Sequence, residues 1–537
     1  MTHVTLTRGE RPTSTLAKAA ALLLALLPPA RMAWIVFTNG ENNLSNDYGL
    51  RVPLVVSILD GTCSLGKYFR EAWVAGGHSM IALIPIYYVN ARFFDWSVWV
   101  ELGLGLALAA ATLVLLASAI PGSARFLLLP LLSLLLFSTS RVTVFTFGEP
   151  ALQYGLSQLG VAIGVYALVR LRERPIALAT ALAVGGILAS WSWGGGIMTW
   201  PVFGVALLFF RVRSAGAWAI FLSGGVVGVA QYVWLLFFRA PVPRALTVAP
   251  SLKFRAILDL LGRPFIRGIG EYGPSLESQI FGLAGIAVLA ILLFRGRTAP
   301  QPVPALVLIG WSLLVATQIA LFRSEAAPWY VYPMAIFWAG LLLLLADAPA
   351  RYRAGGVLAI AVLSLIVQST WEDKSFYLRS RSPASAACLR EWRTAPPECG
   401  ERLFQWKGGA SPAWLGEPLE HHHLSVFGSR RTYLLQGDLA VGRVAVDSAN
   451  TSALFSSDGV TTGDPNDFHR LDLILAPGST VRWRVDLPPS LKSAQFLTRV
   501  HAVPGDDTLA RGARVSVTAE GSPASLEERA FLPRETA

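Results

Sequence analysis

Long apolar stretches separated by short polar segments fill the first two thirds of the chain. About 20 apolar residues are enough for a helix to cross the hydrocarbon layer of a bilayer. The pattern therefore predicts a mainly α fold, a polytopic transmembrane helical bundle of about eleven spans. The expected spans lie near residues 16–37, 97–120, 125–141, 153–170, 176–192, 196–210, 215–238, 278–294, 303–322, 331–348 and 354–370.

The pattern changes after residue 370. Residues 371–431 are rich in Arg, Pro and Ser and are typical of a linker, whereas residues 432–537 contain short runs that alternate apolar and polar positions. Turns rich in Gly, Pro, Asp and Asn separate these runs, which favours an antiparallel β-sandwich. The runs are RTYLLQG, GRVAVDS, RLDLILAPG, TVRWRVDLP, QFLTRVHAV and ARVSVTAEG. We therefore expect three regions: a bundle over 1–370, a linker over 371–431 and a sandwich over 432–537.

Composition agrees with a membrane protein. Hydrophobic residues make up 53% of the 537 residues, and the mean hydropathy is +0.50, which is more apolar surface than a soluble domain can bury. The net charge of +11 is compatible with nucleic-acid binding. However, the basic residues lie mostly in pairs between apolar runs, a spacing typical of membrane topology rather than of a nucleic-acid interface.

These basic pairs also predict an orientation. They occupy short loops on one side of the expected bundle: Arg170, Arg172, Arg174, Arg211, Arg213, Arg295, Arg297, Arg351 and Arg353. By the positive-inside rule this side faces the cytoplasm, together with the N-terminus of an uncleaved first span. The long loops 38–96 and 239–277 and the C-terminal sandwich are then extracytoplasmic.

The first outer loop, residues 38–96, is the leading candidate for a functional site. It carries Glu41, Asp47, Asp60, Glu71 and His78, a dense set of titratable groups for a chain in which only 15% of residues are charged. A loop of this length is usually functional or disordered. We interpret it as a catalytic face with Asp47 as the leading residue, and Asp47 as a helix N-cap or Asx turn is the structural alternative.

Polar residues of the expected spans cluster at their outer ends. They are Glu101, Glu149, Gln153, Gln231, Gln318, Arg323, Glu325 and Gln368. An ion-coupled transporter needs charges or broken helices near the middle of the membrane. The distribution therefore favours chemistry at the outer interface, although each residue by itself can simply mark a helix end.

Two further features belong to the extracytoplasmic segments. Cys388 and Cys399 lie close together in the sequence, and we expect them to form a disulfide in an oxidising compartment, with Cys63 left free. The tract His421–His423 has no carboxylate or Cys partner at ligand spacing, so no metal site is assigned there.

The order of several short motifs resembles the GT-C superfamily of membrane glycosyltransferases, over roughly residues 16–370. These motifs are Asn46-Asp47-Tyr48, Gly77-His78, Glu149 with Gln153, a Ser-Trp-Gly-Gly-Gly run before Trp200-Pro201, and Trp329-Tyr330. The resemblance implies a bacterial inner-membrane enzyme that transfers a sugar, with inversion, from a polyprenyl-phosphate donor. It also implies a first-loop carboxylate as general base and a C-terminal domain similar to carbohydrate-binding modules.

Sugar transfer to a hydroxyl requires a base near the acceptor proton and positive charge on the departing phosphate. Asp47 is the expected base, with Glu41 and His78 as further catalytic candidates. Asn46 and Tyr48 flank Asp47 and are expected to orient the substrate. So are Glu149, Gln153, Trp329 and Tyr330.

Arginine is the best expected ligand for the donor phosphate, because its guanidinium group binds phosphate oxygens bidentately. Arg323 is the first candidate, and Arg51 and Arg70 compete with it.

Many superfamily members carry paired acids for a divalent ion, whereas here Asp47 has only Glu41 six residues earlier. No metal ligands are assigned, and a requirement for Mg²⁺ or Mn²⁺ stays open.

The expected partners are a polyprenyl-phosphate-linked sugar, a cell-envelope glycan, lipid or protein acceptor, and the bilayer, but no nucleic acid. Two alternatives remain. The chain could be a flippase or transporter of lipid-linked glycans, or a non-catalytic envelope protein that binds glycans.

Overall fold

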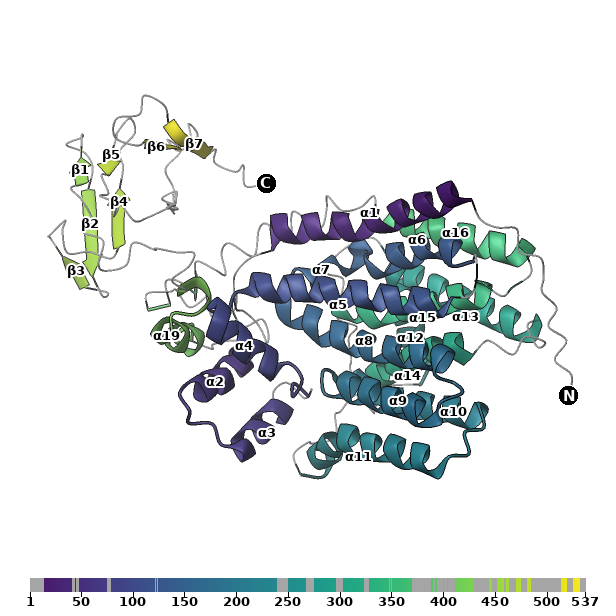
Figure 1. Ribbon diagram of the computed structural model, residues 1–537. Helices are drawn as coiled ribbons and strands as arrows, with labels where there is room; N and C mark the ends of the chain where they lie inside the picture. The colour runs from purple at the N-terminus through teal and green to yellow at the C-terminus, as the bar shows by residue number, and fades with distance from the viewer. Residues whose placement is uncertain are drawn as a thin grey trace, which may run out of the picture. The chain divides into compact units, whose positions relative to one another are not determined.

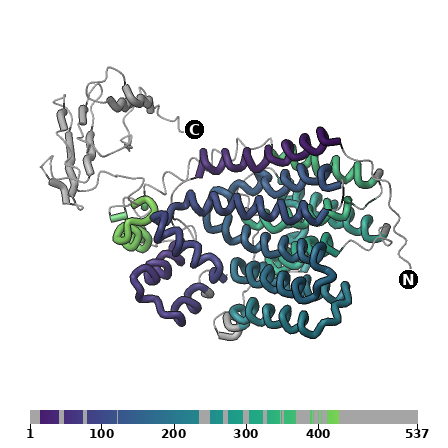
Figure 2. Tube along the Cα trace, in the orientation of Figure 1, coloured from purple at the N-terminus to yellow at the C-terminus, as the bar shows by residue number. Residues whose placement is uncertain are grey.

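A computed structural model describes the chain from residue 14 to residue 427 with gaps (Figure 2), and the backbone of seven strands beyond it (Figure 1). The gaps cover residues 41–43, 45–47, 75–78, 121, 123, 239–249, 267–274, 296–302, 323–327, 347, 349, 369–387, 390–391, 394–398, 400–402 and 404–410. The chain divides into two compact units, here called the helical unit (Met1–Gly428) and the C-terminal unit (Ser429–Ala537).

The helical unit is a bundle of long apolar helices with a cap of short helices at one end (Figure 1). The long helices of the bundle are α1 (Thr15–Asn39), α5 (Val98–Ala119), α6 (Ala124–Leu136), α8 (Gly148–Arg170), α9 (Pro175–Ser190), α10 (Thr199–Phe209), α11 (Ala215–Phe238), α12 (Pro250–Gly262), α13 (Leu276–Arg295), α14 (Val303–Phe322), α15 (Val331–Ala346) and α16 (Ala350–Gln368).

Each of the eleven expected spans coincides with a helix of this bundle. Seven helical segments are long and apolar enough to cross a membrane, and the remaining apolar helices have 10–17 residues. The seven are Thr15–Asn39, Val98–Ala119, Ala124–Phe145, Gly148–Arg170, Ala215–Val233, Leu276–Phe294 and Val303–Phe322. The molecule thus has the helices of a multi-pass membrane protein, with seven of the expected spans supported by length and composition.

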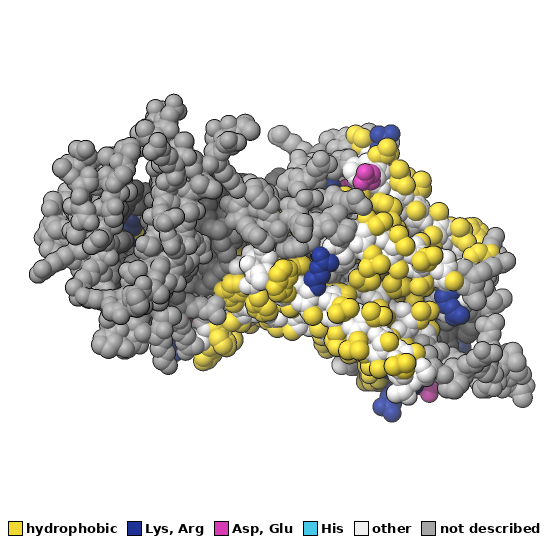
Figure 3. All heavy atoms as spheres, turned by 90° about the horizontal axis from the view of Figure 1, so that it is seen from above, with side chains coloured by type: hydrophobic (Ala, Val, Ile, Leu, Met, Phe, Trp, Pro, Cys, Tyr) yellow, Lys and Arg dark blue, Asp and Glu magenta, His cyan; other side chains and the backbone are white. Residues whose placement is uncertain are grey.

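The bundle is apolar inside and outside. Helix α8 lies at its centre, where it packs against α5 and α9, and α15 is buried along almost its whole length. Side chains such as Leu23, Leu27 and Trp34 of α1 are exposed. The face seen in Figure 3 is mostly hydrophobic, with few charged side chains in its described part. A surface of this kind is stable in lipid and would aggregate in water.

The short helices of the cap come from two distant parts of the chain. The first loop supplies α2 (Tyr48–Leu59), α3 (Leu65–Val74) and α4 (Ile84–Phe94), and the segment after the bundle supplies α19 (Ala413–His421) with the 3-10 turn η7 (Ser425–Phe427). Figure 1 shows these helices together at the end of the bundle where α5 begins. The described part of the expected linker therefore belongs to the helical unit.

The C-terminal unit contains only strands among its described residues. They form an antiparallel pair of β1 (Val444–Val446) with β5 (Val481–Trp483), a sheet β3-β2-β4 and an antiparallel pair of β6 (Ala513–Thr518) with β7 (Ser525–Phe531). The middle sheet consists of β2 (Ser452–Ser457), β3 (Val460–Thr462) and β4 (Arg470–Ile474).

Strands β1, β4, β5 and β6 fall in four of the expected alternating runs. The runs at 431–437 and 495–503 lie outside the described residues, and β2, β3 and β7 were not anticipated. Three small antiparallel sheets are established here, and their packing into one sandwich stays a prediction.

Candidate functional site

The cap is anchored to the bundle through a buried carboxylate on α5. The hydroxyl group of Tyr48, the first residue of α2, donates a hydrogen bond to Glu101. Asn90 of α4 and the indole N–H of Trp96 donate to the other oxygen of Glu101, at 3.0 and 2.8 Å. Three donors thus satisfy a carboxylate that is fully buried, which is the condition for tolerating such a group inside a protein.

The same contact explains a glycine at the start of α8. A Cβ atom on Gly148 would lie 2.5 Å from the Tyr48 hydroxyl and 2.6 Å from a Glu101 oxygen. Only glycine therefore lets α8 approach this pair.

Burial and the Glu101 carboxylate together raise the pKa of Tyr48 well above its ordinary value, so Tyr48 remains a hydrogen-bond donor at any physiological pH.

A second buried carboxylate, Glu149 of α8, pairs with Arg51 of α2. The Arg51 Nη2 and Nε atoms lie 2.9 and 3.3 Å from Glu149 Oε1. Both side chains are almost inaccessible to solvent, at 1% and 3% relative exposure. Arg51 therefore has a carboxylate partner already, and its main role in this arrangement is to hold α2 against α8.

Helix α8 continues this polar line into the bundle. Gln153 and Ser157 follow Glu149 at intervals of four residues, so the three side chains share one face of the helix. Both residues are buried, at 5% and 0% exposure. Within the described part of the chain, Gln153 Nε2 and Ser157 Oγ have no hydrogen-bond partner. Buried polar groups normally have one, so these two groups stand out on this face of α8.

A group of aromatic rings packs against α8 through Tyr154. Tyr154 of α8 makes an edge contact with Trp193, at 4.8 Å between centroids, and Trp193 in turn neighbours Tyr330, at 6.5 Å. Trp329 packs edge-on against Tyr330 at 6.3 Å. Among the described residues, the indole nitrogen of Trp193 has no hydrogen-bond acceptor. Rings with an apolar face and a polar edge next to unpaired amide and hydroxyl groups suit a sugar.

A buried arginine adjoins this aromatic group through Tyr332, whose ring centroid lies 6.0 Å from that of Tyr154. Arg141 ends the 3-10 turn η2 (Thr139–Arg141), which separates α6 from α7 (Val142–Phe145), and it is completely buried. Its guanidinium group donates to Gln158 of α8 at 3.1 Å and lies 3.3 Å from the ring centroid of Tyr332. No carboxylate lies within ion-pair distance of it among the residues that the structure describes.

Arg141 corrects one expectation. The sequence pattern places this residue at the end of the expected span 125–141, and polar residues of the spans are expected at their outer ends. Gln158, its partner, is nine residues beyond Glu149, about 13 Å further along α8 at 1.5 Å per residue. The helix that the pattern extended to residue 141 ends at Leu136. The break brings Arg141 inside, and neither the position nor the burial is visible in the hydrophobic pattern.

The segment after the bundle covers the first loop. The indole N–H of Trp414 in α19 donates to the carbonyl oxygen of Gly49 at 2.9 Å, and His422 Nε2 lies 3.1 Å from Asp60 Oδ1. Cys388 and Cys399, the expected pair, form a disulfide with Cα atoms 5.3 Å apart, and Cys63 is free. The disulfide closes the loop that precedes α19, so it belongs to the cap.

Some of the expected site residues lie outside the described part of the chain: Glu41, Asn46, Asp47, His78 and Arg323. The structure brings the others together in part. Tyr48, Arg51, Glu149 and Gln153 meet where α2 contacts α5 and α8, and Trp329 and Tyr330 belong to the aromatic group. Arg70 is exposed on α3 and takes no part in these contacts.

Sequence reasoning assigned no role to Glu101, Arg141 or Trp193. A lone carboxylate in the first turn of an apolar helix was the available signal for Glu101, and it was treated only as one of several interfacial groups. The Gly-rich run after Trp193 forms the 3-10 turn η3 (Gly194–Met198) between α9 and α10. A Cβ atom on Gly196 would lie 2.0 Å from the carbonyl oxygen of Ala189, so this glycine serves close backbone packing.

Among the described residues, no group of three His, Cys, Asp or Glu side chains lies close enough to hold a metal ion. The polar ligands that this site offers are instead amide, hydroxyl and indole groups beside paired carboxylates. No protein-family model matches the sequence, and no curated protein matches it either.

Proposed function

We propose that the protein is a GT-C-like membrane glycosyltransferase that transfers a sugar from a polyprenyl-phosphate donor to a cell-envelope acceptor on the outer face. The observation that carries the proposal is the buried anchoring of α2 at the ends of α5 and α8. Tyr48 and Arg51 are held there by Glu101 and Glu149, and Asp47 is joined to Tyr48 by a peptide bond.

The chemistry assigns Asp47 the role of general base. Its carboxylate removes the proton of the acceptor hydroxyl, the hydroxyl oxygen forms a bond to the anomeric carbon, and the bond from that carbon to the polyprenyl phosphate breaks with inversion. Glu149 is a poorer base, because its charge is paired with Arg51 in a buried site. Arg323 is the proposed ligand of the departing phosphate, since a guanidinium group stabilises the negative charge that develops there.

The sugar-binding part of the proposal rests on α8 and its aromatic neighbours. Gln153 and Ser157 offer an amide and a hydroxyl that lack partners among the described residues, and Tyr154, Trp193 and Tyr330 offer ring faces and edges. Sugars combine hydroxyl groups with apolar C–H faces, so such a mixture binds them well. The three small sheets of the C-terminal unit are consistent with a carbohydrate-binding sandwich that engages the acceptor.

The decisive experiment replaces Asp47 by Asn in a strain that lacks the chromosomal gene. We expect wild-type protein to restore an envelope glycan, detected by mass spectrometry, and Asp47→Asn to lower its amount by about 100-fold or more, since general-base catalysis contributes roughly 10²–10⁴-fold. Membrane levels of the variant should equal those of the wild type.

Asp60→Asn is the matched control, because Asp60 belongs to the same loop and its partly exposed side chain pairs with His422 in the cap. It should restore the glycan fully. Full restoration by Asp47→Asn would remove the proposed base and with it the mechanism.

One observation favours a second candidate function. A fully buried arginine beside a break between α6 and α7 is a feature that transporters use to bind anionic substrates at depth. A flippase for lipid-linked glycans would therefore use Arg141. Arg141→Gln would then cause the unchanged lipid-linked glycan to accumulate on the inner leaflet, whereas loss of a transferase leaves the donor able to cross the membrane.

A further inference from the structure

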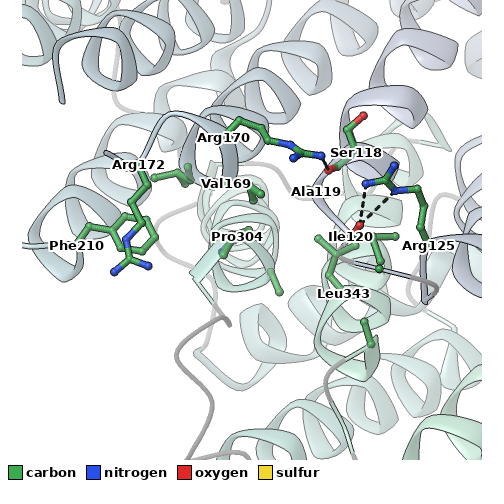
Figure 4. A pocket seen from close by; sticks show the side chains of 14 residues that line it. Ser118, Ala119, Ile120, Arg125, Val169, Arg170, Arg172, Phe210, Pro304 and Leu343 are labelled. Atoms are coloured by element: carbon green, nitrogen blue, oxygen red, sulfur yellow. Dashed lines mark hydrogen bonds between the residues drawn. The ribbon is translucent and has the colours of Figure 1, made fainter. Parts of the chain in front are cut away.

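The opposite end of the helical unit has a cavity that the proposed glycosyl transfer does not use. It has a volume of about 460 Å³ and lies between the ends of α5, α8, α10 and α15 and the beginnings of α6 and α14. Figure 4 shows Arg125, Arg170 and Arg172 around it. This is the end of the bundle that carries the basic loops.

These three arginines have no counter-ion among the described residues. Within the described part of the chain, no carboxylate lies within ion-pair distance of any of them. Arg125 donates to the carbonyl oxygen of Ile120 at 3.2 and 3.3 Å, and Arg170 donates to that of Ser118 at 3.2 Å. The guanidinium carbon of Arg172 lies 4.7 Å from the ring centroid of Phe210.

These contacts orient the guanidinium groups and leave most of their N–H donors without an acceptor among the described contacts. Each guanidinium has five N–H donors, and the carbonyl bonds engage one or two of them. Attraction to the carbonyl end of α5 explains why Arg125 and Arg170 lie where they do. Arg172 lines the same cavity from the side of Phe210, so it adds positive charge there (Figure 4). An anion at Arg125 and Arg170 would use the donors that their carbonyl bonds leave unused.

The remaining lining indicates which kind of anion. Apart from the arginines and Ser118, it is mostly apolar, with Leu168, Val169, Pro304 and Leu343 among the contributors. Nearby, Leu208 and Phe209 of α10 are exposed on a helix of the bundle, at 65% and 60%. A phosphate between arginines, with an apolar wall beside it, matches a phospholipid whose acyl chains lie along the bundle.

We propose that this cavity binds the phosphate group of an anionic phospholipid. By the positive-inside rule the cavity faces the cytoplasmic leaflet, where anionic lipids attract basic residues. The proposal is independent of the glycosyl transfer, because the proposed active site lies at the end of the bundle that carries the cap.

The test uses full-length protein in a neutral detergent and measures the binding of phosphatidylglycerol, phosphatidylcholine and free glycerol phosphate by native mass spectrometry. We expect phosphatidylglycerol to bind more tightly than phosphatidylcholine, and free glycerol phosphate not to bind at the same concentration. The double variant Arg125→Gln/Arg170→Gln should bind phosphatidylglycerol roughly 30-fold more weakly, with about fivefold for each arginine.

Arg174→Gln/Arg213→Gln removes the same charge at the same end from two exposed arginines that do not line the cavity, and it should keep wild-type affinity. If the first double variant does not fold, Arg172→Gln tests the site alone, with an expected loss of about fivefold. Equal losses in the pocket and control variants would overturn the proposal. So would equal binding of the two lipids, or binding of free glycerol phosphate as tight as that of the lipid.

Discussion

Two buried carboxylates, Glu101 and Glu149, show how single residues position the first loop. Each lies in the first turn of a long apolar helix, and each accepts hydrogen bonds from residues of the first loop. A hydropathy pattern locates Glu101 and Glu149 but does not identify their partners. Tyr48 and Arg51 are distant in sequence and contact these residues only after folding. The sequence therefore identified Glu149 as a candidate without its ion pair.

The first prediction concerns this ion pair. Glu149→Gln leaves the Arg51 guanidinium charged and buried without its counter-ion. Breaking a buried pair in this way costs about 3–5 kcal/mol. We expect the free energy of unfolding, measured by denaturant titration in detergent, to fall by about that amount.

Asp60→Asn supplies the comparison for stability. The Asp60 side chain is 42% exposed and that of its partner His422 is 19% exposed. Partly exposed pairs contribute up to about 1 kcal/mol. If the two substitutions change the free energy of unfolding equally, the buried pair does not fix α2.

At the scale of elements, hydrophobic patterns predicted the positions of helices well, but they predicted poorly where a helix is interrupted. The long runs that became α5, α11 and α14 were identified within one or two residues at each end. The end of α6 at Leu136 was missed, although the polar run from Ser138 to Arg141 interrupts the apolar pattern there. The reason for the break lies in packing and hydrogen bonding, where Ser138 accepts from the backbone of Ser140.

The cap gives a second prediction at this scale. Removing the disulfide with Cys388→Ala/Cys399→Ala should destabilise the segment that precedes α19 by about 2–3 kcal/mol in the chain-entropy account. The docking of α19 on α2 through Trp414 and Gly49 should loosen with it. We expect faster hydrogen exchange in both helices, measured by mass spectrometry.

Cys63→Ala is the matched control, since Cys63 is free and only partly buried. It should leave the exchange of α2 and α19 unchanged. Unchanged exchange in the double variant would mean that the loop closed by the disulfide does not support α19.

At the scale of the whole molecule, the chain consists of a helical unit and a C-terminal unit. The described hydrophobic core of the helical unit ends with Phe427. The linker expected over 371–431 contributes Leu389, Leu403 and Leu415 to this core. Composition did not predict that these leucines belong to the core. The segment is rich in Pro, Ser and Arg, which is typical of a linker, and its few leucines are recognised as core residues only from their packing partners.

A truncation after Gly428 tests this division. Because the chain divides into two compact units after Gly428, we expect the shortened protein to keep its helical circular dichroism and its thermal unfolding midpoint in detergent within a few degrees. Size-exclusion chromatography should show a single species.

If the C-terminal unit recognises the acceptor, the shortened protein folds but fails to restore the envelope glycan. Loss of helical signal on truncation would contradict the division into two units that fold separately.

The sequence alone determined that the chain is a multi-pass helical membrane protein, because the length and apolarity of a span are properties of consecutive residues. It also determined the pairing of Cys388 with Cys399, whose separation of 11 residues makes the pair local. Only the tertiary structure decided which polar residues meet: Tyr48 with Glu101, Arg51 with Glu149 and Arg141 with Gln158. Such contacts depend on how helices cross and where they break, and packing between distant segments sets both.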